Sequence, residues 1–286
     1  MLKSGPRQNC ATPSFGMVRG DAAPATMRAH NLIAAIMTLL ALLLRLPLLA
    51  CLPALAGAAA PLELQIVQRP PYLEVLPGGA MDGIAVRPAL AAFRKAGIEV
   101  TLREVPALRQ LQRLKSNQER VCSVGWYKTR ERLQFAKYSA ALSQDTPWAA
   151  FTNLPAAPVG ETTVRAMLAN ERLTVLLKVG FVYGDYLDQE LSTMRAQGKL
   201  THADMPQVFR MIEVGRAQLT FAPIEEIQHY LKYYSTSTGA SQIITFAEMP
   251  AGYKRYLMCS KLVEDSLLAR FNAALARLPA KAERTR

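Results

Sequence analysis

From residue 61 onward, short apolar runs typical of β-strands alternate with segments whose apolar residues recur at helical spacing. This alternation is typical of helices packed on the faces of a mostly parallel sheet, so we predict an α/β fold. The first group of elements comprises strands at residues 62–67, 98–105 and 121–125. One helix lies between the first two strands, with Asp82 as its predicted cap and Gly97 at its end, and a second is striped by Leu108, Leu111 and Leu114.

A second group of similar elements follows in the middle of the chain. Strands are predicted at residues 174–181 and 217–222, with one helix after Gly184, one from Pro206 to Gly215 and one from Pro223. A last amphipathic helix covers residues 262–278. The two groups predict two lobes, each a mostly parallel sheet flanked by helices.

The most apolar part of the chain covers residues 32–58 and precedes both groups. Arg28 supplies a basic lead-in and residues 54–56 offer a small-x-small cleavage site, so residues 1–56 are interpreted as an export signal region, with Met27 as a candidate start. A cleaved signal peptide predicts a periplasmic protein. Two alternatives stay open: an uncut membrane anchor, disfavoured by Arg45 within the run, and a lipid anchor at Cys51.

Removal of this region leaves Cys122 and Cys259 as the two cysteines of the mature chain. An even pair in an oxidising compartment favours a disulfide over two separate buried thiols. The cysteines and the three histidines show no CxxC or HxxxH spacing, so no metal and no cofactor are predicted. The net charge of +12 is scattered along the chain, and together with export it argues against a nucleic-acid partner.

Four short motifs, in order, resemble bacterial extracellular solute-binding proteins of the polar amino acid type, known as family three. They are Gln-Arg-Pro-Pro-Tyr at 68–72, Thr-Arg-Glu-Arg with a following Phe-Ala-Lys-Tyr-Ser at 129–139, Val-Gly-Phe-Val-Tyr-Gly at 179–184, and Gly-Arg-Ala-Gln-Leu-Thr at 215–220. Cys122 and Cys259 are similar to those of an uncharacterised cysteine-bearing subgroup. The resemblance covers most of residues 62–278.

The resemblance implies a two-lobed type II periplasmic binding protein fold, with lobe one at residues 60–150 plus 251–286 and lobe two at 151–250. It places both cysteines in lobe one, where a segment at 256–260 returns as a strand. It further implies a monomeric periplasmic protein that captures a small polar or carboxylate-bearing solute between its lobes. The expected partner is an inner-membrane permease of an ABC transporter, or a sensor.

The resemblance also assigns candidate ligand-binding residues. Arg132 matches the family's carboxylate-binding arginine, because a guanidinium can hold a carboxylate with two charge-assisted hydrogen bonds; a solvated helix-surface arginine is the alternative. Tyr72 and Trp126 are candidate apolar walls, or ordinary packing residues. The other candidates are Thr129 beside Arg132, the helix start at Gly184, Asp185 and Tyr186, and the acid Glu225.

Three departures from the family pattern argue against free α-amino acids as ligands. Pro223 stands where the family has the acid that holds the ligand's amino group, and Glu225 and Glu226 are its possible substitutes. Gln218 and Arg87 stand where other acids are usual. An enzyme on the same fold, such as a cyclic acid dehydratase-like periplasmic lyase with Glu225 as its acid or base, is the alternative function. We predict a binding protein instead, because no nucleophile is paired with a base.

Overall fold

The computed structural model describes residues 61–154, 163–236 and 241–279. The predicted export region lies outside the described residues, and so do Met27 and Cys51, so these assignments stay predictions. None of the helices in the described residues combines the length and the apolar content needed to cross a bilayer.

Lobe one is built on a five-stranded sheet in the order β4-β1-β5-β12-β6. Its strands are β1 (Leu62–Ile66), β4 (Val100–Glu104), β5 (Val121–Tyr127), β6 (Ala136–Gln144) and β12 (Lys254–Ser260). β1 pairs in parallel with β4 and β5, whereas β12 runs antiparallel to β5 and β6. A small hairpin, β2 (Glu74–Val75) and β3 (Met81–Asp82), follows β1.

The helices of lobe one are α2 (Val86–Ala96), α3 (Ala107–Ser116), α4 (Arg130–Leu133) and α9 (Asp265–Ala276). α2 buries a stripe of Val86, Ala89, Ala92 and Phe93 and packs on α9 through Phe93 and Phe271, whose ring centroids lie 4.6 Å apart. It ends at Gly97, whose φ of 62° suits a residue without a Cβ atom.

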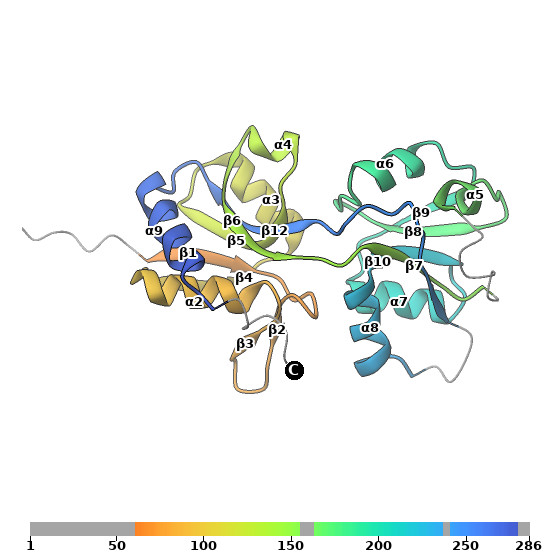
Figure 1. Ribbon diagram of the computed structural model, residues 1–286, viewed down its shortest axis with the longest axis horizontal. Helices are drawn as coiled ribbons and strands as arrows, with labels where there is room; N and C mark the ends of the chain where they lie inside the picture. The colour runs from red at the N-terminus through yellow and green to blue at the C-terminus, as the bar shows by residue number, and fades with distance from the viewer. Residues whose placement is uncertain (1–60, 155–162, 237–240, 280–286) are drawn as a thin grey trace, which may run out of the picture. The chain divides into compact units, whose positions relative to one another are not determined.

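Lobe two is built on a second five-stranded sheet in the order β11-β7-β10-β8-β9. Its strands are β7 (Trp148–Thr152), β8 (Thr174–Lys178), β9 (Gln197–Thr201), β10 (Leu219–Pro223) and β11 (Gln242–Ile244). Its helices are α5 (Val164–Leu168), α6 (Asp185–Ser192), α7 (Met205–Glu213) and α8 (Ile224–Tyr233). The predicted α/β fold, with two sheets flanked by helices, is confirmed (Figure 1).

The chain passes between the two sheets twice, from β6 to β7 and from β11 to β12 (Figure 1). The two connecting segments lie side by side, because the Asp145 amide donates to the Tyr253 carbonyl at 2.9 Å. A Cβ atom on Gly252 would lie 1.9 Å from the Asp145 carbonyl oxygen, so only glycine allows this approach. The predicted lobe limits at residues 150 and 251 stay predictions; the pairing assigns all of β7 to the second sheet and all of β12 to the first.

Several local predictions differ from the structure; among them, the strand predicted at 174–181 ends at Lys178. Asp82 does not cap α2: it lies in β3 and binds Arg87 through two hydrogen bonds of 2.7 and 2.8 Å, while Ala85 occupies the N-cap. α3 buries Gln110 and Leu114 and leaves Leu108 exposed, so its predicted leucine stripe does not coincide with its buried face. The strand predicted at 121–125 continues to Tyr127.

Cys122 and Cys259 form the predicted disulfide. They lie opposite each other on the antiparallel strands β5 and β12, with their Cα atoms 4.0 Å apart, and both are fully buried. The bond therefore joins two neighbouring strands of lobe one, within a single sheet.

Candidate ligand-binding site

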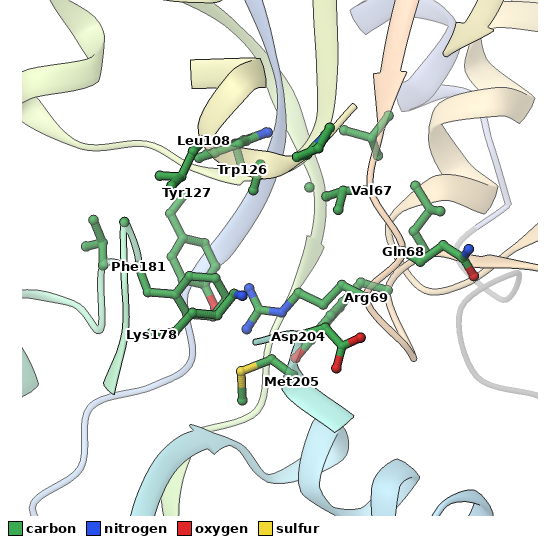
Figure 2. A pocket seen from close by; sticks show the side chains of 18 of the residues that line it. Val67, Gln68, Arg69, Leu108, Trp126, Tyr127, Lys178, Phe181, Asp204 and Met205 are labelled. Atoms are coloured by element: carbon green, nitrogen blue, oxygen red, sulfur yellow. The ribbon is translucent and has the colours of Figure 1, made fainter. Parts of the chain in front are cut away.

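A cavity of about 260 Å³ lies where residues of both lobes meet (Figure 2). Its lobe-one wall comes mainly from the segment after β1, the start of α3, the end of β5, α4 and β12. Its lobe-two wall comes from the end of β8, the segment that follows it and the residues that lead into α7. The carboxyl ends of parallel strands are where open α/β sheets usually bind ligands. Most of the lining is apolar or aromatic, and its charged members are Arg69, Arg132, Lys178, Asp204 and Arg255.

Arg132 is held in place by its own short helix. Thr129 caps α4 by accepting a hydrogen bond from the Arg132 amide at 3.2 Å, and Arg132 Nη1 donates to the Tyr127 carbonyl at 3.0 Å. The guanidinium lies 4.8 Å from the centre of the Trp126 ring. It is buried, and within the described part of the chain no carboxylate forms an ion pair with it. Burial lowers the pKa of Arg132, and the nearby Tyr138 and Glu131 offset this only in part.

Trp126 is fixed by a buried glutamine that sequence reasoning missed. Its indole N–H donates to Gln110 Oε1 at 3.0 Å, and Gln110 Nε2 donates to the Val105 carbonyl at 2.8 Å. Gln110 is fully buried, although glutamine side chains are mostly exposed in folded proteins. The Trp126 ring is therefore a wall of defined orientation.

Arg255 and Asp145 form a buried ion pair at the base of the site. Arg255 Nε and Nη2 donate to the two carboxylate oxygens of Asp145, both at 2.7 Å, and Asp145 also accepts from the Tyr127 hydroxyl. The guanidinium stacks 3.4 Å from the centre of the Tyr72 ring. Burial opposes the charge of Arg255, but its neighbours, Asp145 among them, outweigh this and raise its pKa well above the ordinary value.

A second ion pair links the lobes directly. Arg69, in the loop after β1, donates from Nε and Nη2 to Glu226 on α8 at 2.7 and 2.8 Å. Glu226 is almost fully buried, and the Arg69 guanidinium lies 4.5 Å from the centre of the Phe181 ring (Figure 2). Burial opposes the charge of Arg69, but Glu226 outweighs it and raises the pKa of Arg69.

Two further contacts join the lobes beside this pair. The Tyr72 hydroxyl donates to Glu225 at 2.7 Å, and His229 Nε2 lies 2.8 Å from a Glu74 carboxylate oxygen. Glu225 also accepts from the Thr146 amide at 3.2 Å and from the Thr146 hydroxyl. Burial raises the pKa of Glu225.

Among the described residues, Lys178 is the cation that lobe two contributes to the cavity wall. Its ammonium donates to the carbonyl oxygens of His202, at 3.3 Å, and of Ala203, and lies 5.3 Å from the centre of the Phe181 ring. No carboxylate of the described residues forms an ion pair with Lys178. Burial lowers its pKa.

Of the predicted site residues, the structure brings Arg132, Trp126 and Tyr72 to the cavity. Thr129 serves as the cap of α4 and is not in the lining. Gly184, Asp185 and Tyr186 lie outside the lining as well, because the Asp188 carboxylate accepts from the Gly184 amide at 3.1 Å and the Tyr253 ring covers Gly184. Tyr186 instead lies 3.4 Å from Glu248.

Glu225 also lies outside the cavity lining, with its carboxylate engaged by Tyr72 and Thr146. The acid on which the lyase alternative depends therefore does not face the cavity. The described residues also contain no group of three or more His, Cys, Asp and Glu side chains placed to hold a metal ion.

No protein-family model matches this chain, and no curated protein matches its sequence. Solved structures do match its fold. An ancestral arginine-binding protein bound to arginine aligns with a TM-score of 0.62 at 15% identity, covering 78% of this chain and 93% of that one. A structure concerned with glutathione import through GshT and the cystine ABC importer TcyBC of Streptococcus mutans aligns with a TM-score of 0.63 at 12% identity, covering 78% and 91%.

A histidine kinase sensor domain with similarity to periplasmic binding proteins aligns with a TM-score of 0.61 at 16% identity, covering 76% of this chain and 89% of that one. At these identities the likeness shows the fold. The chain has the two-lobed α/β fold of the type II periplasmic binding proteins. Among these neighbours the fold occurs in solute-binding proteins and in a sensor domain.

Proposed function

We propose that this protein is an exported solute-binding protein that captures a small polar or carboxylate-bearing solute between its two lobes. The observation that carries the proposal is Arg132, a buried guanidinium with no acidic partner in the described residues, at the edge of an aromatic-lined cavity. A buried cation without a counter-charge is costly, and an incoming carboxylate removes that cost with two charge-assisted hydrogen bonds.

The rest of the cavity suits the body of such a solute. Trp126 and Phe181 supply flat apolar faces from opposite lobes, and Leu108 adds a further apolar side chain to the lining. A volume of about 260 Å³ is slightly below the usual range for sites that bind drug-sized molecules, so it suits a smaller ligand. Contacts from both lobes would make binding favour the closed arrangement.

A role in transport or sensing is the corresponding proposal for partners. The solved neighbours include a substrate-binding protein of an amino acid ABC transporter and a histidine kinase sensor domain, which supports either an inner-membrane permease or a sensor. We propose a monomer that acts in the periplasm after cleavage of residues 1–56. A mature N-terminus near Gly57 in the soluble fraction is expected, and a lipid on Cys51 or an intact signal in the membrane fraction would contradict it.

The test of the binding site compares Arg132→Ala with Arg130→Ala, an exposed arginine on the same helix. A screen of small carboxylates by thermal shift identifies a ligand, and calorimetry measures its affinity for the three proteins. Loss of Arg132 is expected to cost about 2–5 kcal/mol of binding free energy, because the ligand carboxylate loses a desolvated partner. Arg130→Ala is expected to leave the affinity unchanged, and equal affinities for all three proteins would reject Arg132 as the anchor.

A further inference from the structure

Two acids at the start of α8, the buried Glu226 and the half-buried Glu225, lie outside the cavity lining and are bound by groups of lobe one. Both carboxylate oxygens of Glu226 accept hydrogen bonds from the Arg69 guanidinium. Glu225 accepts from the Tyr72 hydroxyl and from the amide and hydroxyl of Thr146. Both carboxylates are therefore engaged by groups of the chain itself.

Among the described residues, one acid, Asp204, belongs to the cavity lining. Asp204 is exposed, and its Oδ1 accepts from the Gln207 amide at 2.9 Å as the N-cap of α7. Its negative charge favours the charged form of the neighbouring Lys178 ammonium. An exposed carboxylate beside a lysine attracts a ligand ammonium only weakly, because solvent screens the interaction.

Among the described residues of the cavity lining, the cations Arg69, Arg132, Lys178 and Arg255 outnumber the one acid, Asp204. Arg69 and Arg255 are paired with Glu226 and Asp145, whereas Arg132 and Lys178 form no ion pair with a carboxylate of the described residues. A ligand carboxylate suits these two cations. A ligand ammonium would lie among cations whose neighbouring buried carboxylates are already engaged.

We propose that the ligands are organic anions that lack an amino group, and that Arg69 sets this specificity by occupying Glu226. The inference rests on the proposed solute-binding function. Arg69 takes the position, opposite the lobe-two acid, that a ligand ammonium would need. The chain thereby supplies its own cation for closing the lobes and leaves Arg132 and Lys178 for the anionic end of the ligand.

The experiment uses pairs of probes that differ only in the α-amino group: 3-phenylpropanoate against L-phenylalanine, and 4-methylpentanoate against L-leucine. Calorimetry on the mature wild-type protein is expected to show that the amine-free member of each pair binds at least roughly tenfold tighter, because burying an unpaired ammonium is costly. Arg69→Met exposes Glu226 to the ligand, so the ratio is expected to shift toward the amino acid by roughly tenfold.

The double variant Arg69→Met/Glu226→Gln is the matched control, because it removes the cation and the acid together. It is expected to restore the preference for the amine-free probe, and it leaves no unpaired buried charge if Arg69→Met alone fails to fold. Amino acids that bind the wild type as tightly as their amine-free partners would overturn this inference and leave the solute-binding function standing. Failure of every carboxylate, with or without an amine, to bind would overturn the proposed function and this inference with it.

Discussion

The buried pair of Arg255 and Asp145 makes lobe stability sensitive to a change of one atom. Asp145→Asn keeps the shape of the side chain but replaces a carboxylate oxygen with an amide nitrogen that faces guanidinium N–H groups. The Asp145 side chain has no solvent exposure and that of Arg255 only 2%, so water cannot supply the missing acceptor. Breaking a buried pair by removing one partner costs about 3–5 kcal/mol, because a charge is left buried and uncompensated.

A loss of that size is a large part of the roughly 5–15 kcal/mol that stabilises a typical domain. Urea unfolding of the mature protein, followed by circular dichroism, measures it as a lower midpoint with an unchanged slope. The control is Glu171→Gln, which removes one partner of the Arg195–Glu171 pair, where the side chains are 69% and 63% exposed. That change is expected to cost less than about 1 kcal/mol.

A double variant separates the charge effect from the loss of packing. Asp145→Leu/Arg255→Met replaces the pair with apolar side chains, and it is expected to recover most of the stability that Asp145→Asn loses. If Asp145→Asn costs no more than Glu171→Gln, the reasoning about this buried pair is wrong, because the uncompensated charge would then cost no more in the interior than at the surface.

The elements of the fold were largely predictable because each depends on local spacing. The stripe of α2 and the cap at Gly97 are read directly from neighbouring residues. β6 and β9 were not predicted, since their residues are mixed in polarity and β9 is mostly exposed. Pairing partners supplied from elsewhere in the sheet stabilise such strands, and local sequence does not encode them.

The site was predictable only in part for a related reason. Arg132 and Trp126 were found because a motif resemblance pointed to them. Arg69 and Arg255 carry charges that ordinarily predict exposure, and their partners lie 157 and 110 positions away in the chain. Only the folded arrangement brings these arginines to their acids.

Two further predictions concern groups that this arrangement buries. Replacing Cys122 and Cys259 with serine removes a bond across 137 positions and is expected to cost about 2–5 kcal/mol in urea unfolding; two titratable thiols in the unfolded, unreduced wild type would contradict the bond. Glu225→Gln tests the half-buried carboxyl group whose pKa is raised in the folded state by partial burial. Because the folded wild type then holds a proton that the unfolded chain releases, its stability falls relative to the variant as pH rises through the folded pKa. We therefore expect urea unfolding at about pH 5 and about pH 8 to show that the stability of the variant, relative to that of the wild type, is greater at the higher pH. A wild type that gains on the variant instead would mean that the hydrogen bonds from Tyr72 and Thr146 stabilise the carboxylate more than burial disfavours it.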